Sequence, residues 1–211
     1  MRTNFLKEIS NMANVKDHYD GSAPTYHEQY DSERVWEHDE YPSSYFRLLK
    51  VIEILRERGV SSVYELGAGE ASPMIAIRQA LDVSIRASDL SPEMVRFGKA
   101  NLESHGMDPE WLTELDILDP EAVAAESERV GQSDAVLALG VIPHVEDDAW
   151  FVEAMSRFVK PGGTLILQFR NSMFSMFTFN RLTKELILDE LLEPVPEKFR
   201  EVVAADLDQR L

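Results

Sequence analysis

The stretch VYELGAGEASP, residues 63–73, places a glycine-rich turn between an apolar strand and the start of a helix. Gly67 can take a positive φ, and Gly69 lets the backbone approach a ligand closely. Ser72 followed by Pro73 is typical of a helix N-cap and the first helical residue. The stretch therefore predicts a strand, a turn that cradles a small molecule, and a helix.

The turn is incomplete as a nicotinamide fingerprint. In the pattern G-x-G-x-x-G that begins at Gly67, the last glycine would fall at position 72, which is Ser72. The distinctive features are instead Glu65, two residues before the first glycine, and the loop after Gly69. The run Glu65-Leu66-Gly67-Ala68-Gly69 resembles the first motif of class I S-adenosylmethionine-dependent methyltransferases, where an acid precedes G-x-G at the end of the first strand.

Composition limits the classes of partner. The 211 residues include 38 acidic and 21 basic side chains, and the net charge of −17 repels phosphate backbones and anionic lipid surfaces. We therefore expect neither a nucleic acid nor a membrane as partner. Cysteine is absent, which excludes disulfides and cysteine nucleophiles and is typical of a reducing compartment. With no signal peptide and no apolar run of about 18 residues, the sequence predicts a cytoplasmic protein.

A single domain is expected from a chain of this length with 44% hydrophobic residues. Within residues 1–211 we expect a helical lid or arm over 1–60, a cofactor-binding core over 61–170 and a helical tail over 171–211. Helical segments separate the β-rich runs, which predicts an α/β, doubly wound, mostly parallel sheet of about five strands. The expected strands are residues 62–66, 83–88, 112–116, 135–139 and 164–169.

Helix ends are readable in several places. Residues 43–58 are expected to form an amphipathic helix, because apolar residues recur every third position from Phe46 to Leu55, and Gly59 supplies a stop. Ser91 followed by Pro92 predicts the N-cap of a later helix.

Two features lie further along the chain. A helix over about residues 147–159 can be capped by Asp147 or Asp148. Its expected apolar face consists of Phe151, Val152, Met155, Phe158 and Val159.

Residues 171–180 are unusually rich in Met and Phe, which either line an apolar ligand pocket or pack onto the sheet.

Successive expected strands end in the acids Glu65, Asp89 and Asp116. Because open α/β sheets bind ligands at the carboxyl edge of their strands, these acids should gather at one binding site. Asp89 lies 20 residues after Gly69, where a ribose lies in a doubly wound sheet. The alternative is that Asp89 begins the cap of the next helix, but its position favours the ligand.

With Val159-Lys160-Pro161-Gly162-Gly163 before the last strand, these features resemble the class I methyltransferase pattern over about residues 60–170. The resemblance implies S-adenosyl-L-methionine as cofactor, S-adenosyl-L-homocysteine as product and a small molecule as methyl acceptor. The implied contacts are Gly67, Ala68 and Gly69 with the methionine part, Glu65 with its amino group, Asp89 with the ribose, Leu90, Asp116 and Ile117 with the adenine, and Leu139 and Gly140 with the methyl end. The family often has a third glycine where this chain has Ala71, and we expect alanine to be tolerated if its φ is negative.

The candidate catalytic residue is His144, which follows the fourth expected strand at the edge where an acceptor would approach the methyl group. It can act as a general base. The alternative is an orienting or structural role, which is the commoner one for histidines at such positions.

The N-terminal region contributes two weaker sets of residues. The stretch around Tyr19, Tyr26 and Tyr30 resembles the N-terminal lid of small-molecule methyltransferases, in which a tyrosine closes over the cofactor. The histidines His18, His27 and His38 match no metal-binding spacing. We therefore expect a solvated surface there and no metal site.

The family sheet normally has seven strands, and little sequence remains here for the last two. After residue 169 the pattern is helical until Pro194 and Pro196. Either the chain is a piece of a longer protein, or a partner covers the exposed fifth strand, which makes a homodimer plausible.

The leading functional hypothesis is methyl transfer from S-adenosylmethionine to an oxygen or nitrogen of a small metabolite. One alternative is a nicotinamide-dependent oxidoreductase on the same type of sheet. Another is a regulatory or assembly subunit that binds the cofactor without catalysis.

Overall fold

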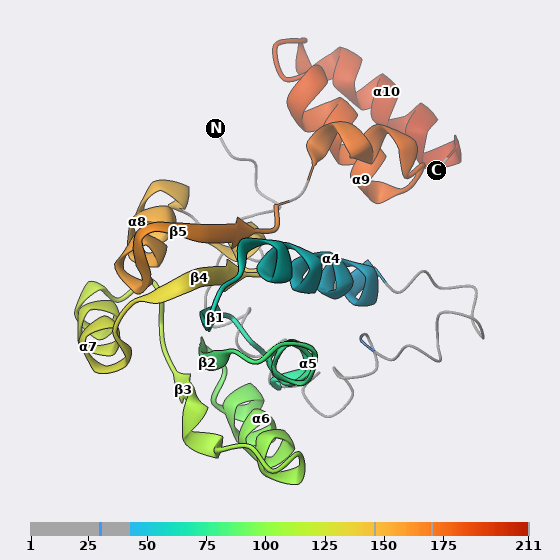
Figure 1. Ribbon diagram of the computed structural model, residues 1–211. Coiled ribbons are helices and arrows are strands. Elements are labelled where there is room, and N and C mark those ends of the chain that lie inside the picture. Colours follow the sequence, from blue (N-terminus) through green and yellow to red (C-terminus); the bar gives the residue numbers. More distant parts are fainter. Residues whose placement is uncertain (1–29, 31–42, 146, 170, 211) are drawn as a thin grey trace. The chain divides into compact units, whose positions relative to one another are not determined.

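The computed structural model describes Tyr30 and residues 43–145, 147–169 and 171–210 (Figure 1). The described residues separate into two compact units, one ending at Gln168 and one beginning at Phe169. We call them the sheet unit and the helical unit. Tyr19 and Tyr26, and the three N-terminal histidines, lie outside the described residues.

The sheet unit is built on five parallel strands in the order β3-β2-β1-β4-β5. The strands are β1 Ser62–Leu66, β2 Ser84–Asp89, β3 Leu112–Glu114, β4 Ser133–Ala138 and β5 Val159–Leu167. The predicted doubly wound fold is confirmed, and β5 begins earlier than expected because it includes the Pro161-Gly162-Gly163 run. The order reverses between β1 and β4, which is the switch point where such sheets bind ligands.

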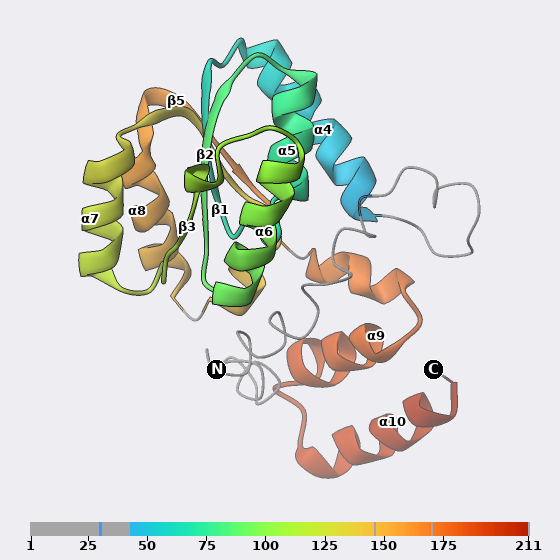
Figure 2. The same ribbon diagram turned by 90° about the horizontal axis from the view of Figure 1, so that it is seen from below.

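Helices cover both faces of the sheet (Figure 2). On one face lie α4 Ser43–Arg58, α5 Ser72–Ala80 and α6 Pro92–Ser104, and on the other α7 Pro120–Val130 and α8 Asp148–Phe158. Side chains of β1 alternate between the two cores, since Val63 joins the first hydrophobic cluster while Tyr64 and Leu66 join the second. Glu65 therefore projects to the same side as Val63.

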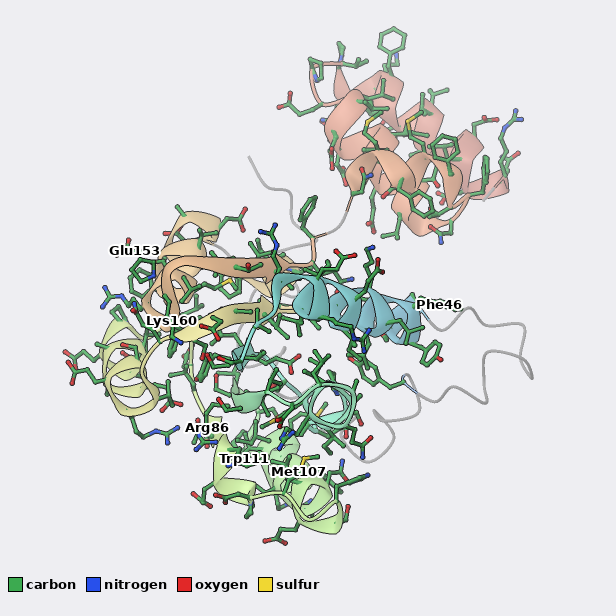
Figure 3. All side chains as sticks on the ribbon, viewed as in Figure 1. Phe46, Arg86, Met107, Trp111, Glu153 and Lys160 are labelled. Carbon is green, nitrogen blue, oxygen red and sulfur yellow. The ribbon has the colours of Figure 1, made fainter. Side chains whose placement is uncertain are left out.

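Helix α4 has the predicted bounds and ends before Gly59, but its buried stripe differs from the expected one. The buried residues are Leu48, Val51, Ile52 and Leu55. Phe46 and Leu49 are 38% and 45% exposed, and Phe46 points away from the sheet (Figure 3). The expectation was wrong for these two because a strict spacing of three drifts around a helix of 3.6 residues per turn.

Helix α8 begins one residue after its cap. Asp147 accepts a hydrogen bond from the Trp150 N–H at 3.0 Å, so Asp147 rather than Asp148 is the cap. Val152, expected on the apolar face, is 40% exposed, and Val159 belongs to β5. Ala154 completes the buried face instead.

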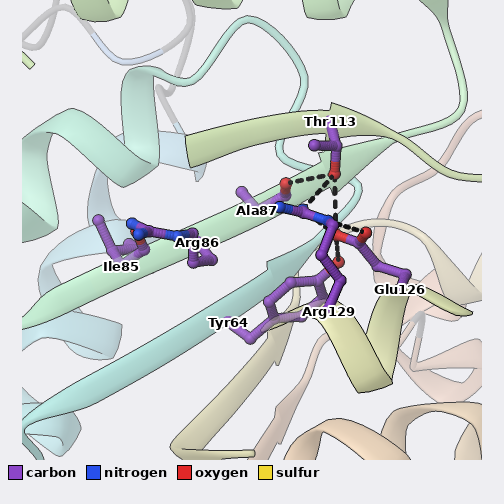
Figure 4. A network of polar contacts seen from close by, with 7 residues as sticks. All are labelled: Tyr64, Ile85, Arg86, Ala87, Thr113, Glu126 and Arg129. Carbon is purple, nitrogen blue, oxygen red and sulfur yellow. Dashed lines mark hydrogen bonds and ion pairs between the residues drawn. The ribbon is translucent and has the colours of Figure 1, made fainter. Parts of the chain in front are cut away.

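A polar network joins α7 to the sheet (Figure 4). Glu126 accepts hydrogen bonds from the Tyr64 hydroxyl at 3.1 Å and the Thr113 hydroxyl at 2.9 Å, and it pairs with Arg129. Burial opposes ionisation, but the hydrogen bonds from Arg129 and Thr113 outweigh it and lower the pKa of Glu126. Tyr64 also stacks on Phe158 with ring centroids 4.4 Å apart. The network therefore ties β1, β3 and α7 together.

The helical unit consists of η4 Ser172–Phe177, α9 Arg181–Glu185, the π-helical turn η5 Leu186–Leu191 and α10 Glu197–Arg210. Asn180 and Thr183 form a capping box at the start of α9. The Met and Phe side chains of the unusual stretch are exposed: Met173, Phe174, Met176, Phe177 and Phe179. None of the helices in the described part of the chain has the length and apolar character needed to cross a membrane.

Candidate functional site

The glycine turn after β1 is fixed to β2 by its own backbone. The N–H groups of Gly67 and Ala68 both donate to the Ser88 carbonyl, at 2.8 and 3.1 Å. Gly67 has a φ of +73°, and a Cβ placed there would lie 2.3 Å from Val141 Cγ2. The first glycine is therefore required both by backbone conformation and by the close approach of the loop after β4.

Helix α5 begins at Ser72, one residue earlier than the sequence predicts. Ala71, not Ser72, occupies the N-cap position, and no side chain caps the helix there. Ala71 has φ +71° and ψ 7°, so the condition under which alanine would be tolerated, a negative φ, is not met. A left-handed conformation costs a residue with a Cβ about 1–2 kcal/mol. The Ser72 hydroxyl donates to Glu70 Oε2 at 2.9 Å instead of capping the helix.

Glu65 is buried at the carboxyl end of β1, with 1% of its surface exposed. No described residue donates a hydrogen bond to its Oε2 atom. Burial raises the pKa of Glu65 from 4.5 to about 8; Arg47 opposes the shift, and the negative charges of Asp89 and Glu70 add to it. A buried carboxyl oxygen without a donor is costly, so this atom is suited to receive a donor from a ligand.

The cation beside Glu65 is Arg47 of α4, which the sequence analysis did not single out. Arg47 Nη2 donates to the Tyr30 hydroxyl at 3.0 Å, and Nη1 donates to Gln168 Oε1. Burial raises the pKa of Tyr30 to about 12 despite the opposing field of Arg47. Arg47 Nε is buried and has no acceptor among the described residues. A sequence signal for Arg47 is that it lies four residues before the apolar Val51, on the same face of the predicted helix.

Gln168, which directly follows β5, lies beside Arg47. Its backbone N–H donates to the Ala138 carbonyl at 3.1 Å, and its side chain lies over Gly140. A Cβ built on Gly140 would lie 3.5 Å from Gln168 Oε1 and 3.8 Å from Arg47 Nη1. The carboxyl ends of β1, β4 and β5 therefore meet under the Arg47–Gln168 pair.

Asp89 performs two structural tasks at the end of β2. Its Oδ2 accepts the Gly69 N–H at 2.8 Å, and its Oδ1 accepts the Ser91 N–H at 2.9 Å. Ser91 is the predicted N-cap of α6, with its hydroxyl accepting the Met94 N–H at 3.0 Å. Each oxygen of a carboxylate has two lone pairs and can accept more than one hydrogen bond.

The remaining predicted contact residues lie along the same edge in different environments. Asp116 follows β3, is exposed, and accepts the Leu118 N–H at 2.8 Å. Leu90 is half-buried, whereas Ile117 and Leu139 are buried in hydrophobic clusters on opposite faces of the sheet. Ala68 is buried in the turn itself.

His144 ends the short 3₁₀ turn η3, Ile142–His144, which follows β4. The residue is half-buried, and its backbone N–H donates to the Val141 carbonyl at 2.9 Å. The contact of Val141 with Gly67 links this turn to the glycine turn. Within the described residues, no group of three or more His, Asp or Glu side chains is arranged to hold a metal ion.

Comparison with known families identifies the strand-and-turn arrangement. Residues 64–165 match the family model described as a methyltransferase domain. Over this stretch, about half of its length, the chain is similar to methyltransferase domains. The matched residues run from β1 into β5 and include the glycine turn, Asp89, Asp116 and His144.

Curated relatives of the methyltransferase domain carry one recurring description. The ubiquinone biosynthesis O-methyltransferase of Xanthomonas oryzae pv. oryzae (strain PXO99A) is 30% identical over 107 residues, covering 51% of this chain and 42% of that protein. The protein of the same description from Methylocella silvestris is 29% identical over 109 residues, covering 51% of this chain and 40% of its own length. The chain thus spans less than half the length of these relatives.

Solved structures share the fold of the methyltransferase domain. Magnesium protoporphyrin IX methyltransferase from Synechocystis PCC 6803, solved with bound SAH, is 16% identical with a TM-score of 0.51 over 71% of this chain and 68% of that one. The [4+2]-cyclase SpnF is 17% identical with a TM-score of 0.52 over 72% of this chain and 58% of that one. At such identities the likeness concerns the fold alone.

Proposed function

We propose that this chain transfers a methyl group from S-adenosylmethionine to an oxygen or nitrogen of a small-molecule acceptor. The observation that carries the proposal is Glu65: a buried carboxyl oxygen without a donor, at the switch point of the sheet and beside the glycine turn. Such an oxygen suits the ammonium group of the cofactor's methionine part. The O-methyltransferase description of the relatives favours oxygen as the acceptor atom.

The residues at the edge match the parts of that cofactor in chemical type. Glu65 would accept from the amino group, and Arg47 supplies the positive charge and buried N–H that suit the carboxylate. Asp89 would accept from the ribose hydroxyls through its carboxylate oxygens. Leu90 and Ile117 would flank the adenine, with Asp116 accepting from its amino group.

When bound, the cofactor supplies a methyl group already activated by a positively charged sulfur. The chain's own task is therefore to align the acceptor in line with that methyl group and to exclude water. Leu139 and Gly140 would lie beside the methyl end, with the Arg47–Gln168 pair above Gly140. His144 would stand on the acceptor side, as a general base or as an orienting group.

Two alternative functions remain testable. A nicotinamide-dependent oxidoreductase would use the same Asp89 for a ribose, but the third glycine of its fingerprint is replaced by Ser72. A non-catalytic cofactor-binding subunit would bind S-adenosylhomocysteine without turnover. The fold alone does not decide between chemistries, because its solved neighbours include one described as a [4+2]-cyclase.

Isothermal titration of the chain with S-adenosylhomocysteine, NAD and NADH separates the first two functions. We expect heat with S-adenosylhomocysteine and none with the dinucleotides. Transfer of an isotope-labelled methyl group to components of a metabolite extract then tests catalysis. Binding to a dinucleotide alone would overturn the proposal, and binding without any methyl transfer would favour the regulatory subunit.

We further propose a cytoplasmic protein that forms a homodimer through β5. In the described sheet β5 pairs only with β4, which leaves its other side as an edge of Val159–Leu167. Exposed strand edges tend to associate. Light scattering at high protein concentration should show a dimer, and a monomer at all concentrations would contradict it.

A further inference from the structure

Helix α6 holds the tip of the glycine turn through Asn101. The Asn101 side-chain Nδ2 donates to the Glu70 backbone carbonyl at 2.9 Å and to Glu70 Oε2 at 2.6 Å. Both partners are acceptors, so the nitrogen of the amide must face them. A single side chain thus fixes both the backbone and the carboxylate of Glu70.

The same helix face is shaped to receive the turn. Gly98 lies three residues before Asn101, so the two residues are neighbours on one face of α6. A Cβ built on Gly98 would lie 3.2 Å from the Glu70 carbonyl carbon and 2.4 Å from Leu112 Cδ2. The backbone of Glu70 therefore packs directly against the helix.

Glu70 immediately precedes Ala71, the alanine with a φ of +71°. The left-handed conformation is unfavourable for a residue with a Cβ, so it persists only where the surroundings enforce it. Glu70 Oε2 also accepts the Ser72 hydroxyl at 2.9 Å, and the Glu70 side chain is buried. The residues on both sides of Ala71 are therefore held by one carboxylate, which Asn101 anchors to α6.

We propose that Asn101 is a positioning residue for the glycine turn. By anchoring Glu70 it keeps Ala71 in the left-handed conformation and keeps the Gly69 N–H on Asp89 Oδ2, 2.8 Å away. The consequence for cofactor binding rests on the proposed function. Asn101 touches no reacting group and acts only through the turn.

The test uses Asn101→Ala, Ala71→Gly and the double variant, with Glu103→Ala as an exposed control on the same helix. Two quantities are measured in the full chain: hydrogen exchange of the Gly69 amide by NMR, and the dissociation constant of S-adenosylhomocysteine. We expect Asn101→Ala to speed the exchange and weaken the affinity about tenfold each. In the Ala71→Gly background the effects of Asn101→Ala on exchange and on affinity should shrink to about twofold each. Glycine adopts a positive φ without being held by its neighbours.

Equal losses in both backgrounds would overturn the proposal, and so would unchanged exchange of the Gly69 amide in Asn101→Ala. If Asn101→Ala does not fold, the double variant decides. Recovery of folding by Ala71→Gly supports the positioning role of Asn101, and continued unfolding refutes it. If the unaltered chain does not bind S-adenosylhomocysteine, the proposed function fails. Hydrogen exchange of the Gly69 amide still tests the positioning role of Asn101.

Discussion

The Gly69 N–H and the Asp89 carboxylate are joined by a 2.8 Å hydrogen bond that links the turn after β1 to the end of β2. The other oxygen of the same carboxylate accepts the Ser91 N–H at 2.9 Å, directly before α6. One side chain therefore fixes two loops at the edge where we place the cofactor. The structural role of Asp89 does not exclude the proposed binding role, because a carboxylate oxygen can accept more than one hydrogen bond.

Asp89→Ala should weaken binding of S-adenosylhomocysteine by about 1–3 kcal/mol while the fold is retained, since acceptors for the ribose and for Gly69 are lost together. Calorimetry measures the affinity and circular dichroism the fold. Asp108→Ala is the matched control. Asp108 Oδ1 also accepts the backbone N–H of the residue two positions later, Glu110, at 2.9 Å, but Asp108 lies before β3 rather than at the carboxyl end of a strand. An unchanged affinity in Asp89→Ala would remove Asp89 from the site.

A comparison of Gly67→Ala with Gly59→Ala distinguishes the cost of backbone strain from the cost of steric overlap. Both glycines have positive φ, but a Cβ meets nothing within 4 Å at Gly59 and meets Val141 Cγ2 at 2.3 Å at Gly67. Urea unfolding should show a loss of about 1 kcal/mol for Gly59→Ala. The loss for Gly67→Ala should be larger by about 1–3 kcal/mol, the usual cost of overpacking, and Val141→Ala should restore part of it. Equal losses in the two variants would show that the Val141 contact is unimportant.

The pH dependence of stability should reveal Glu65. Its pKa is about 8 in the folded chain and 4.5 ordinarily, so the folded state holds a proton that the unfolded state releases between these values. The contribution of Glu65 to stability is therefore full below about pH 4.5 and is lost as the pH rises towards 8. The unfolding free energy of the unaltered chain relative to Glu65→Gln should fall over this range. A constant difference would mean that Glu65 is ionised throughout.

Binding should show the complementary dependence on pH. If Glu65 receives the ammonium group of the ligand, the ionised carboxyl binds better than the protonated one. Affinity for S-adenosylhomocysteine should therefore rise between pH 6 and 8, with release of a proton, and Glu65→Gln should abolish the rise. Calorimetry in buffers of different ionisation enthalpy counts the proton. Proton uptake on binding would contradict the assignment.

Asp134 provides a test at the amino ends of the strands, away from the proposed site. It accepts the Ser61 and Ser62 N–H groups at 2.8 and 3.0 Å and pairs with Lys160 at 2.8 Å, and the hydrogen bonds from Lys160 and Ser61 lower its pKa. Asp134→Asn should cost on the order of 1 kcal/mol of stability, a modest loss because the group is partly exposed. The stabilisation exists above the pKa of the unfolded aspartate and is lost as the pH falls. Affinity for S-adenosylhomocysteine should not change, and a change would place Asp134 in contact with the site.

Elements with strong local signals were predictable from the sequence. The five strands, the stop at Gly59 and the cap at Ser91 depend on periodicity, glycine and capping chemistry within a few residues. The face of α4 that is buried and the conformation of Ala71 were not predictable in the same way. Both depend on which surfaces the helix and the turn meet, and those surfaces belong to other elements.

The glycine turn, the approximate positions of the five strands and the acids at the strand ends could be predicted from the sequence, because each follows from chemistry within a few neighbouring residues. Only the tertiary structure decided what surrounds those acids. Arg47 meets Gln168, 121 residues away, and Asn101 meets Glu70, 31 residues away. The raised pKa of Glu65 likewise depends on desolvation by elements distant in the chain, and no local pattern encodes which charges a fold brings together.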